Sequence, residues 1–146
     1  MKQENRAFWD TSALLPLLCR DSFSARSREL LRKYSTIVVW WGTPIEIHGA
    51  LSRLQREGRI TAEGVQNVLS LVAELRQRWR EILPVDRVRQ LAEESCLRYG
   101  IRSADALQLA AALVWCNERP KARNFICFDE QLFGAARAAG FTVHSA

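Results

Sequence analysis

Three absences narrow the possibilities for this chain. It contains no run of about 18 or more uncharged apolar residues, so no segment is suited to cross a membrane as a helix. The first ten residues, MKQENRAFWD, lack the apolar stretch and the small-residue cleavage site of a secretory signal. No glycine-rich phosphate loop is present, which argues against a dinucleotide-binding or P-loop domain. We therefore expect a cytoplasmic protein with no membrane association.

Cysteine and histidine are too few and too scattered for a zinc site. The four cysteines lie far apart, contain no CxxC pair and have no histidine at metal-ligand spacing (Cys19, Cys96, Cys116 and Cys127). Only two histidines could act as the base that a catalytic cysteine needs, and neither is well placed. Because each cysteine has apolar neighbours, we expect buried free thiols, as in proteins of reducing compartments.

Lysine is scarce among the basic residues. Of the 21 lysines and arginines only three are lysine (Lys2, Lys33 and Lys121), which leaves 18 arginines, and the net charge is +5. The planar guanidinium suits phosphate groups, so a polyanion such as RNA fits this bias. Solvated helix faces in a protein from a GC-rich genome account for it equally well, so charge alone does not decide.

The rest of the composition is that of one globular domain. With 146 residues, 48% of them hydrophobic, and only 7 glycines and 4 prolines, the chain has ample material for a core. β-branched and aromatic runs alternate with segments of helical periodicity. This alternation predicts a single α/β domain over residues 1–146, with a mostly parallel sheet and helices on both faces. We expect strands near 6–9, 36–41, 81–85, 124–128 and 141–145, and helices near 12–20, 22–34, 43–57, 61–79, 86–100, 103–118 and 129–140.

Several residues predict where individual helices begin. Thr43 as N-cap, Pro44 in the first helical position and Glu46 three residues after Thr43 form a capping box. Ser103 is expected to cap the alanine-rich helix that follows it, and Pro16 is expected near the start of its helix. The helices at 43–57 and 61–79 should form an antiparallel hairpin.

Four acidic residues stand where strands should turn into helices: Asp10, Glu46, Asp105 and Asp129. Parallel sheets bind ligands at the carboxyl ends of their strands, so these carboxylates can converge there. Unpaired charges at a half-buried edge are costly, and a divalent cation would compensate them. Each carboxylate also has a structural explanation as a helix cap or as a partner of the helix dipole. Jointly the capping explanation is weaker, because Asp105 begins a helix that is apolar nearly all round.

The segments around these carboxylates resemble the four motifs of the PIN-domain ribonucleases. They are DTSAL, TPIEIHGAL, RSADALQLAAAL and FICFDEQLFGAARAAG, which occur in the family's order and spacing over nearly the whole chain. The third segment is the most specific and the other three are individually weak. The likeness is greatest to the VapC-type toxins of prokaryotic toxin–antitoxin pairs.

This resemblance implies a PIN-like three-layer α/β/α domain with a protruding helical hairpin. By the same resemblance, the four carboxylates would ligate Mg²⁺ or Mn²⁺, and Ser12 would place a hydroxyl near the metal or its water. The family cleaves RNA endonucleolytically, with the metal activating water. Members commonly form homodimers and are silenced by a small antitoxin. Its tail occupies the acidic crevice and a groove near the hairpin, here Glu46 to Trp79.

The chain departs from the family pattern near its last motif. Cys127 stands where many members have Thr or Ser, and only Glu130 and Gln131 follow Asp129 as further acidic or polar residues, which leaves the number of metal ions open. Candidate phosphate-binding residues are Arg53, Arg56 and Arg102, although Arg102 could instead pair with Asp105.

Two other functions remain open on this fold. The chain could be an RNA-maturation nuclease, or a non-catalytic RNA-binding module that keeps the carboxylates as caps. Metal binding separates the enzyme from the module. A haloacid-dehalogenase-like phosphatase is excluded, because Ser12 occupies the place of its second aspartate. A receiver domain is disfavoured, because no lysine follows Lys121.

Overall fold

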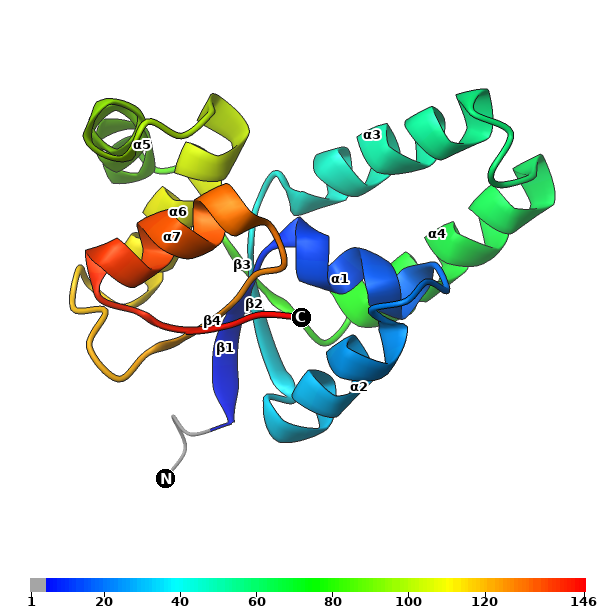
Figure 1. Ribbon diagram of the computed structural model, residues 1–146, viewed down its shortest axis with the longest axis horizontal. Helices are drawn as coiled ribbons and strands as arrows, with labels where there is room; N and C mark the ends of the chain where they lie inside the picture. The colour runs from blue at the N-terminus through cyan, green and yellow to red at the C-terminus, as the bar shows by residue number, and fades with distance from the viewer. Residues whose placement is uncertain (1–4) are drawn as a thin grey trace.

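A five-stranded parallel sheet forms the centre of the computed structural model, which describes residues 5–146 (Figure 1). The strand order is β3-β2-β1-β4-β5. The strands are β1 (Arg6–Trp9), β2 (Thr36–Trp40), β3 (Arg80–Ile82), β4 (Asn124–Ile126) and β5 (Thr142–His144). The helices are α1 (Thr11–Leu18), α2 (Ser24–Lys33), α3 (Thr43–Arg56), α4 (Ala62–Arg76), α5 (Asp86–Tyr99), α6 (Ser103–Trp115) and α7 (Glu130–Ala139). The predicted α/β architecture is confirmed.

Two separate cores cover the two faces of the sheet, because side chains along a strand alternate between its faces. Phe8, Val38 and Phe125 pack on one face with α5, α6 and α7. Trp9 and Val39 pack on the other face with α1 to α4. The result is the predicted three-layer arrangement, with the carboxyl ends of all five strands at one edge.

Helices α3 and α4 form the predicted hairpin, which projects from the side of the molecule in Figure 1. Ile47 and Leu51 of α3 are buried, as are Val68, Val72 and Leu75 of α4, and all five belong to the same core. The helical periodicity of these positions therefore placed the hairpin correctly, because its apolar stripe is what attaches it to the sheet.

Two predicted helix caps are wrong. The N-cap of α3 is Gly42, and Thr43 is a buried helical residue whose Oγ1 lies 3.4 Å from the Gln108 amide nitrogen. The capping box does not form, since the Glu46 carboxylate also bonds Gln108. Helix α6 likewise begins at Ser103 itself, after an N-cap residue, Arg102, that makes no side-chain capping bond.

Pro16 is also not where it was expected. It is the sixth residue of the eight-residue helix α1, so it lies in the second turn and not near the start. A proline in this position cannot donate a backbone bond to the carbonyl of Ser12, four residues earlier. The helix ends two residues later, at Leu18, and Pro16 is buried there.

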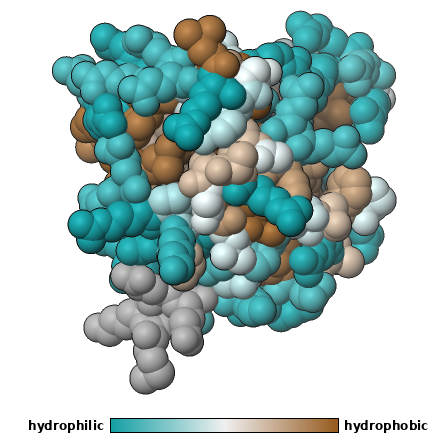
Figure 2. Space-filling model, turned by 60° about the vertical axis from the view of Figure 1, so that its left-hand side comes forward, coloured by the Kyte–Doolittle hydropathy of each residue, from teal (hydrophilic) through white to brown (hydrophobic). Residues whose placement is uncertain are grey.

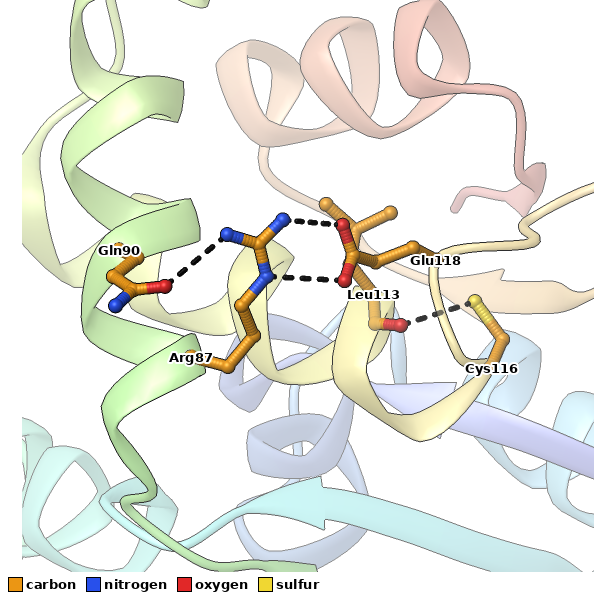
Figure 3. Close-up of polar contacts among 5 residues, drawn as sticks. All are labelled: Arg87, Gln90, Leu113, Cys116 and Glu118. Atoms are coloured by element: carbon orange, nitrogen blue, oxygen red, sulfur yellow. Dashed lines mark hydrogen bonds and ion pairs between the residues drawn. The ribbon is translucent and has the colours of Figure 1, made fainter.

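An exposed ionic contact ties α5 to the turn after α6 (Figure 3). Asn117 and Glu118 in this turn have positive φ angles of 54° and 59°, a conformation that a non-glycine residue such as Glu118 adopts at some cost. Arg87 donates to both oxygens of Glu118, at 2.6 and 3.1 Å, and to Gln90. These bonds lower the pKa of the Glu118 carboxyl, and they hold the far end of α6 against α5.

The surface is mainly hydrophilic on the face shown in Figure 2, with apolar residues visible in small patches. Large exposed apolar side chains include Phe23 and Leu97. Within residues 5–146 no helix is both long and apolar enough to cross a membrane. All four cysteines are free, as expected, but Cys19 and Cys96 are only partly buried.

Candidate metal-binding active site

The carboxyl edge of the sheet carries all four predicted carboxylates. Asp10 follows β1 directly and Asp129 lies three residues after β4, while Glu46 and Asp105 occupy the first turns of α3 and α6. Together with Ser12 they line one cleft of about 350 Å³. The structure thus brings together the five residues that were proposed from the sequence as catalytic.

Asp10 is the most deeply buried member, with 4% of its surface exposed. Its Oδ2 accepts hydrogen bonds from the Ser12 backbone N–H (3.1 Å) and from the Ser12 hydroxyl (2.5 Å), so it caps α1 as well as facing the cleft. Its own backbone N–H donates to the Ile126 carbonyl of β4 at 2.9 Å. Burial raises its pKa to about 6, against the opposing effect of the Ser12 bonds, and the Asp105 charge raises it further.

Glu46 is held by an amide inside the protein. The Gln108 Nε2 donates to a Glu46 carboxylate oxygen at 2.8 Å and lies 3.2 Å from the Thr11 hydroxyl. Burial and the neighbouring Asp10 raise the pKa of Glu46 to about 7, although the bonds from Gln108 and Thr11 oppose this rise. The carboxylate is therefore partly protonated near neutral pH when no cation is present.

Gln108 is a functional candidate that the sequence interpretation missed. It is fully buried, and its Oε1 has no hydrogen-bond partner among the described residues. Its amide nitrogen contacts Thr11, which follows Asp10, and Thr43 and Glu46 of α3, so it links α6 to two of the segments beside the cleft. The signal was available: Gln108 is the one amide in α6 and lies three residues after Asp105, and every residue of α6 after Asp105 except Gln108 is apolar.

Asp105 and Asp129 also line the cleft. Burial raises the pKa of Asp105, the charge of Asp129 raises it further, and the charge of Arg102 lowers it. Asp129 caps α7 by accepting from the Leu132 N–H at 2.9 Å. Over residues 5–146, no basic side chain lies within ion-pair distance of any of the four carboxylates, so the direct Arg102–Asp105 pair is not formed.

This donor set suits a hard divalent cation, because Mg²⁺ and Mn²⁺ prefer carboxylate oxygens. In the described part of the chain, however, no three Asp, Glu, His or Cys side chains form a ready-made ligand group for one ion. The carboxylates surround the cleft without converging on a point. Besides burial, the charge of at least one neighbouring carboxylate raises the pKa of Asp10, Glu46 and Asp105, because like charges repel. A bound cation would offset this repulsion and allow the carboxylates that share the cleft to approach one another.

Cys127 lies beside Asp10 and Ser12, at the place where the chain departs from the PIN motif. Its Sγ is 3.8 Å from both the Asp10 Oδ2 and the Ser12 Oγ, and the same hydroxyl accepts from the Phe128 N–H at 2.9 Å. Burial strongly raises the pKa of this thiol, so Cys127 is neutral and supplies no charge to the cleft. The hydroxyl of Ser12 joins the segment after β4 to the Asp10 carboxylate, because it accepts from Phe128 and donates to Asp10.

One of the three candidate phosphate-binding arginines faces the cleft. Arg53 lines it from α3, about two turns after Glu46. Of the residues that the structure describes, Arg56 and Arg102 are not among those lining it, although both are exposed. Gly49 and Ala50, which sequence reasoning did not single out, line the cleft between Glu46 and Arg53 with little side chain.

Comparisons with known proteins identify the fold. No protein-family model matches the sequence, and no curated protein sequence matches it. A toxin–antitoxin complex from Klebsiella pneumoniae contains a chain with a TM-score of 0.58 and 15% identity, over 87% of this chain and 89% of that one. The VapBC2 complex from Rickettsia felis, bound to a DNA fragment from its promoter, gives a TM-score of 0.64 and 14% identity over 95% and 97%. At these identities the likeness concerns the fold, and this chain has the fold of a VapC-like PIN domain.

Proposed function

We propose that the protein is a divalent-metal-dependent endoribonuclease and the toxin of a toxin–antitoxin pair. The observation that carries this proposal is the cleft into which the sheet edge, α3 and α6 bring four carboxylates, with no basic partner at ion-pair distance within residues 5–146. The burial that raises the pKa of three of them favours either protonation or a bound cation. The VapC-like fold adds support from structures of toxin–antitoxin complexes.

In this proposal Asp10, Glu46, Asp105 and Asp129 hold Mg²⁺ or Mn²⁺. Such an ion, when bound, activates a water molecule near neutral pH and neutralises charge that develops on the scissile phosphate. Ser12 orients the Asp10 carboxylate through its two hydrogen bonds. These residues supply ligands and orientation, and among residues 5–146 no histidine or lysine lines the cleft to act as a metal-free base.

Substrate and partner follow from the same surfaces. Arg53 supplies a guanidinium to an RNA phosphate from the α3 side of the cleft. A small antitoxin covers the acidic cleft and the groove between α3 and α4, which has a volume of about 390 Å³ and is lined by His48, Leu69, Val72, Ala73 and Arg76. A homodimer in the cytoplasm is part of the proposal: the dimer rests on the family resemblance, and the location rests on the sequence features described above.

The decisive experiment is RNA cleavage by purified protein with Mg²⁺ or Mn²⁺ and with excess EDTA. Cleavage should require the metal and should fall by orders of magnitude in Asp105→Asn. The matched control is Asp86→Asn, since Asp86 is also in the first turn of a helix but is exposed and outside the cleft. Cleavage that survives EDTA in a preparation free of contaminating nuclease would refute the metal mechanism.

Growth assays separate a toxin from its alternatives. Expression of the wild type alone should arrest growth, Asp105→Asn should not, and a small protein encoded beside the gene should relieve the arrest. Harmless expression of soluble, active enzyme would favour an RNA-maturation nuclease instead. RNA binding without metal binding or cleavage would favour a non-catalytic module on this fold.

A further inference from the structure

A second cavity of about 420 Å³ opens beside the carboxylate cleft. Three phenylalanines line it from different parts of the chain: Phe23 before α2, Phe128 after β4 and Phe133 in α7. The other lining residues are Cys127, Asp129, Glu130, Ser145 and Ala146. We call this cavity the phenylalanine pocket.

The phenylalanine pocket adjoins the carboxylate cleft, because the two share a lining residue. Asp129 lines both. Cys127 lines the pocket, and its Sγ lies 3.8 Å from the Asp10 carboxylate in the cleft. A nucleic acid whose backbone enters the cleft therefore has an apolar cavity within reach of the nucleotide next to the bound phosphate.

Phe23 presents an exposed aromatic ring to the pocket. Phe23 is 47% exposed, which is unusual for so large an apolar side chain, and its ring meets that of Phe128 edge to face, with centroids 5.8 Å apart at 62°. Its N–H donates to the Asp21 carboxylate at 2.7 Å, which fixes the loop that carries the ring. An exposed ring held in place offers a face on which a base can stack, and every nucleobase has such a face.

The polar groups of the pocket favour a base over an acidic ligand. Asp129 and Glu130 supply carboxylate oxygens, which accept hydrogen bonds from base N–H groups and repel free phosphates or acidic peptides. Arg26 donates to the Ser145 carbonyl at 3.0 Å and also pairs with Glu29 at 3.3 Å, so a guanidinium lies behind that part of the pocket wall.

We propose that the phenylalanine pocket binds one unpaired nucleobase adjacent to the scissile phosphate and thereby helps to select where RNA is cut. The proposal rests on the nuclease function for its biological meaning, and the two are separable by experiment. Phe23 would be a specificity residue that stacks on the base, while the carboxylates of the cleft hold the metal.

The test combines a substrate change with a protein change. After the cleaved bond is mapped in a single-stranded RNA, abasic nucleotides are placed one at a time at the positions flanking it. At one position the abasic RNA should lower kcat/KM roughly 5- to 150-fold, the range of one stacked base. Phe23→Ala should lower kcat/KM on intact RNA by a similar factor but cause little further loss on the abasic RNA. Phe23→Tyr should retain activity, and the control Leu97→Ala, which changes an exposed residue on α5 outside the pocket, should behave as wild type.

A binding assay without catalysis keeps the two proposals distinct. RNA carrying 2-aminopurine at the sensitive position should lose fluorescence on wild-type protein in EDTA, and much less on Phe23→Ala, with folding of both checked by circular dichroism. If the wild-type protein cleaves no RNA, the nuclease proposal fails. The pocket can still be tested by placing 2-aminopurine at successive positions of a single-stranded RNA and measuring its fluorescence with wild type and with Phe23→Ala. Equal effects of Phe23→Ala on intact and abasic RNA would overturn the pocket assignment. An unchanged RNA response with loss of only antitoxin binding would also overturn it and would make the pocket a peptide site.

Discussion

The metal-free protein should become more stable as the pH falls from 8 to 5, the opposite of ordinary acid denaturation. Burial raises the pKa of Asp10 from an ordinary value of 3.8 to about 6 and that of Glu46 from 4.5 to about 7. A raised pKa means that the folded state binds the proton more tightly than the unfolded chain does. The resulting stability is fully present below the unfolded pKa values and is lost as the pH rises through 6 and 7.

The size of the effect follows from these shifts. Asp10 is almost fully buried, and the one pKa unit between its pKa of about 6 and pH 5 corresponds to about 1.4 kcal/mol, with the rest of its shift realised only below pH 5. Glu46 has a similar shift, but it is partly exposed and its shift arises partly from Asp10, so the two contributions do not add in full. Together we expect about 3 kcal/mol, which for a chain of this size moves the melting temperature by roughly 10 °C.

The measurement is thermal unfolding at pH 5 to 8 and constant ionic strength after treatment with EDTA. Asp10→Asn and Glu46→Gln should each flatten the profile and raise the melting temperature at pH 8. Mg²⁺ or Mn²⁺ should stabilise wild type chiefly at high pH, because the ion binds the ionised carboxylates. Burial and the charges of Lys33 and Arg26 lower the pKa of His144, so this residue makes the folded protein less stable as the pH falls through 6.5. This opposing contribution is the same in wild type and in the variants.

The reasoning would be refuted by either of two results. One is a melting temperature of the metal-free wild type that falls steadily from pH 8 to pH 5. The other is a double variant, Asp10→Asn with Glu46→Gln, whose profile has the same slope as that of wild type. Either result would mean that these carboxylates are as well solvated in the folded protein as in the unfolded chain.

Three further outcomes are expected. Without metal, Asp105→Asn should melt at the same or a higher temperature than wild type, because it removes a charge from the acidic cleft. Added Mn²⁺ should stabilise this variant less than it stabilises wild type. Clear destabilisation of the metal-free variant together with unchanged RNA cleavage would exclude a catalytic role for Asp105. Gln108→Leu should lower the free energy of unfolding by about 1.5 to 3 kcal/mol at pH 8, because the charged form of Glu46 loses a hydrogen bond. The loss should be clearly smaller at pH 5. Equal losses at pH 8 and pH 5, measured by urea unfolding, would contradict this. Arg53→Ala should raise the KM for RNA and weaken the salt dependence of that KM. Arg56→Ala, which changes a residue outside the cleft, should change neither quantity much. Equal effects of the two variants in cleavage assays would exclude a specific phosphate contact by Arg53.

The sequence was sufficient for the architecture and for the meeting of the carboxylates. Alternation of strand-like and helical segments implies a parallel sheet, and parallel strands bring their carboxyl ends to one edge. Asp10 and Asp129 follow strands, and Glu46 and Asp105 open helices, so topology alone was enough to place all four on one cleft. Their role as metal ligands remains a prediction.

Tertiary structure decided which polar groups pair and which surfaces meet. The hydroxyl of Thr43 and the carboxylate of Glu46 were available to cap α3, but packing brings Gln108 of α6 within reach of both, and a buried amide without such partners would be costly. The phenylalanine pocket likewise needs Phe23, Phe128 and Phe133 to meet across more than a hundred residues of chain. Local propensity acts over a few residues, whereas hydrogen-bond competition in a buried interior depends on every neighbour that the fold supplies.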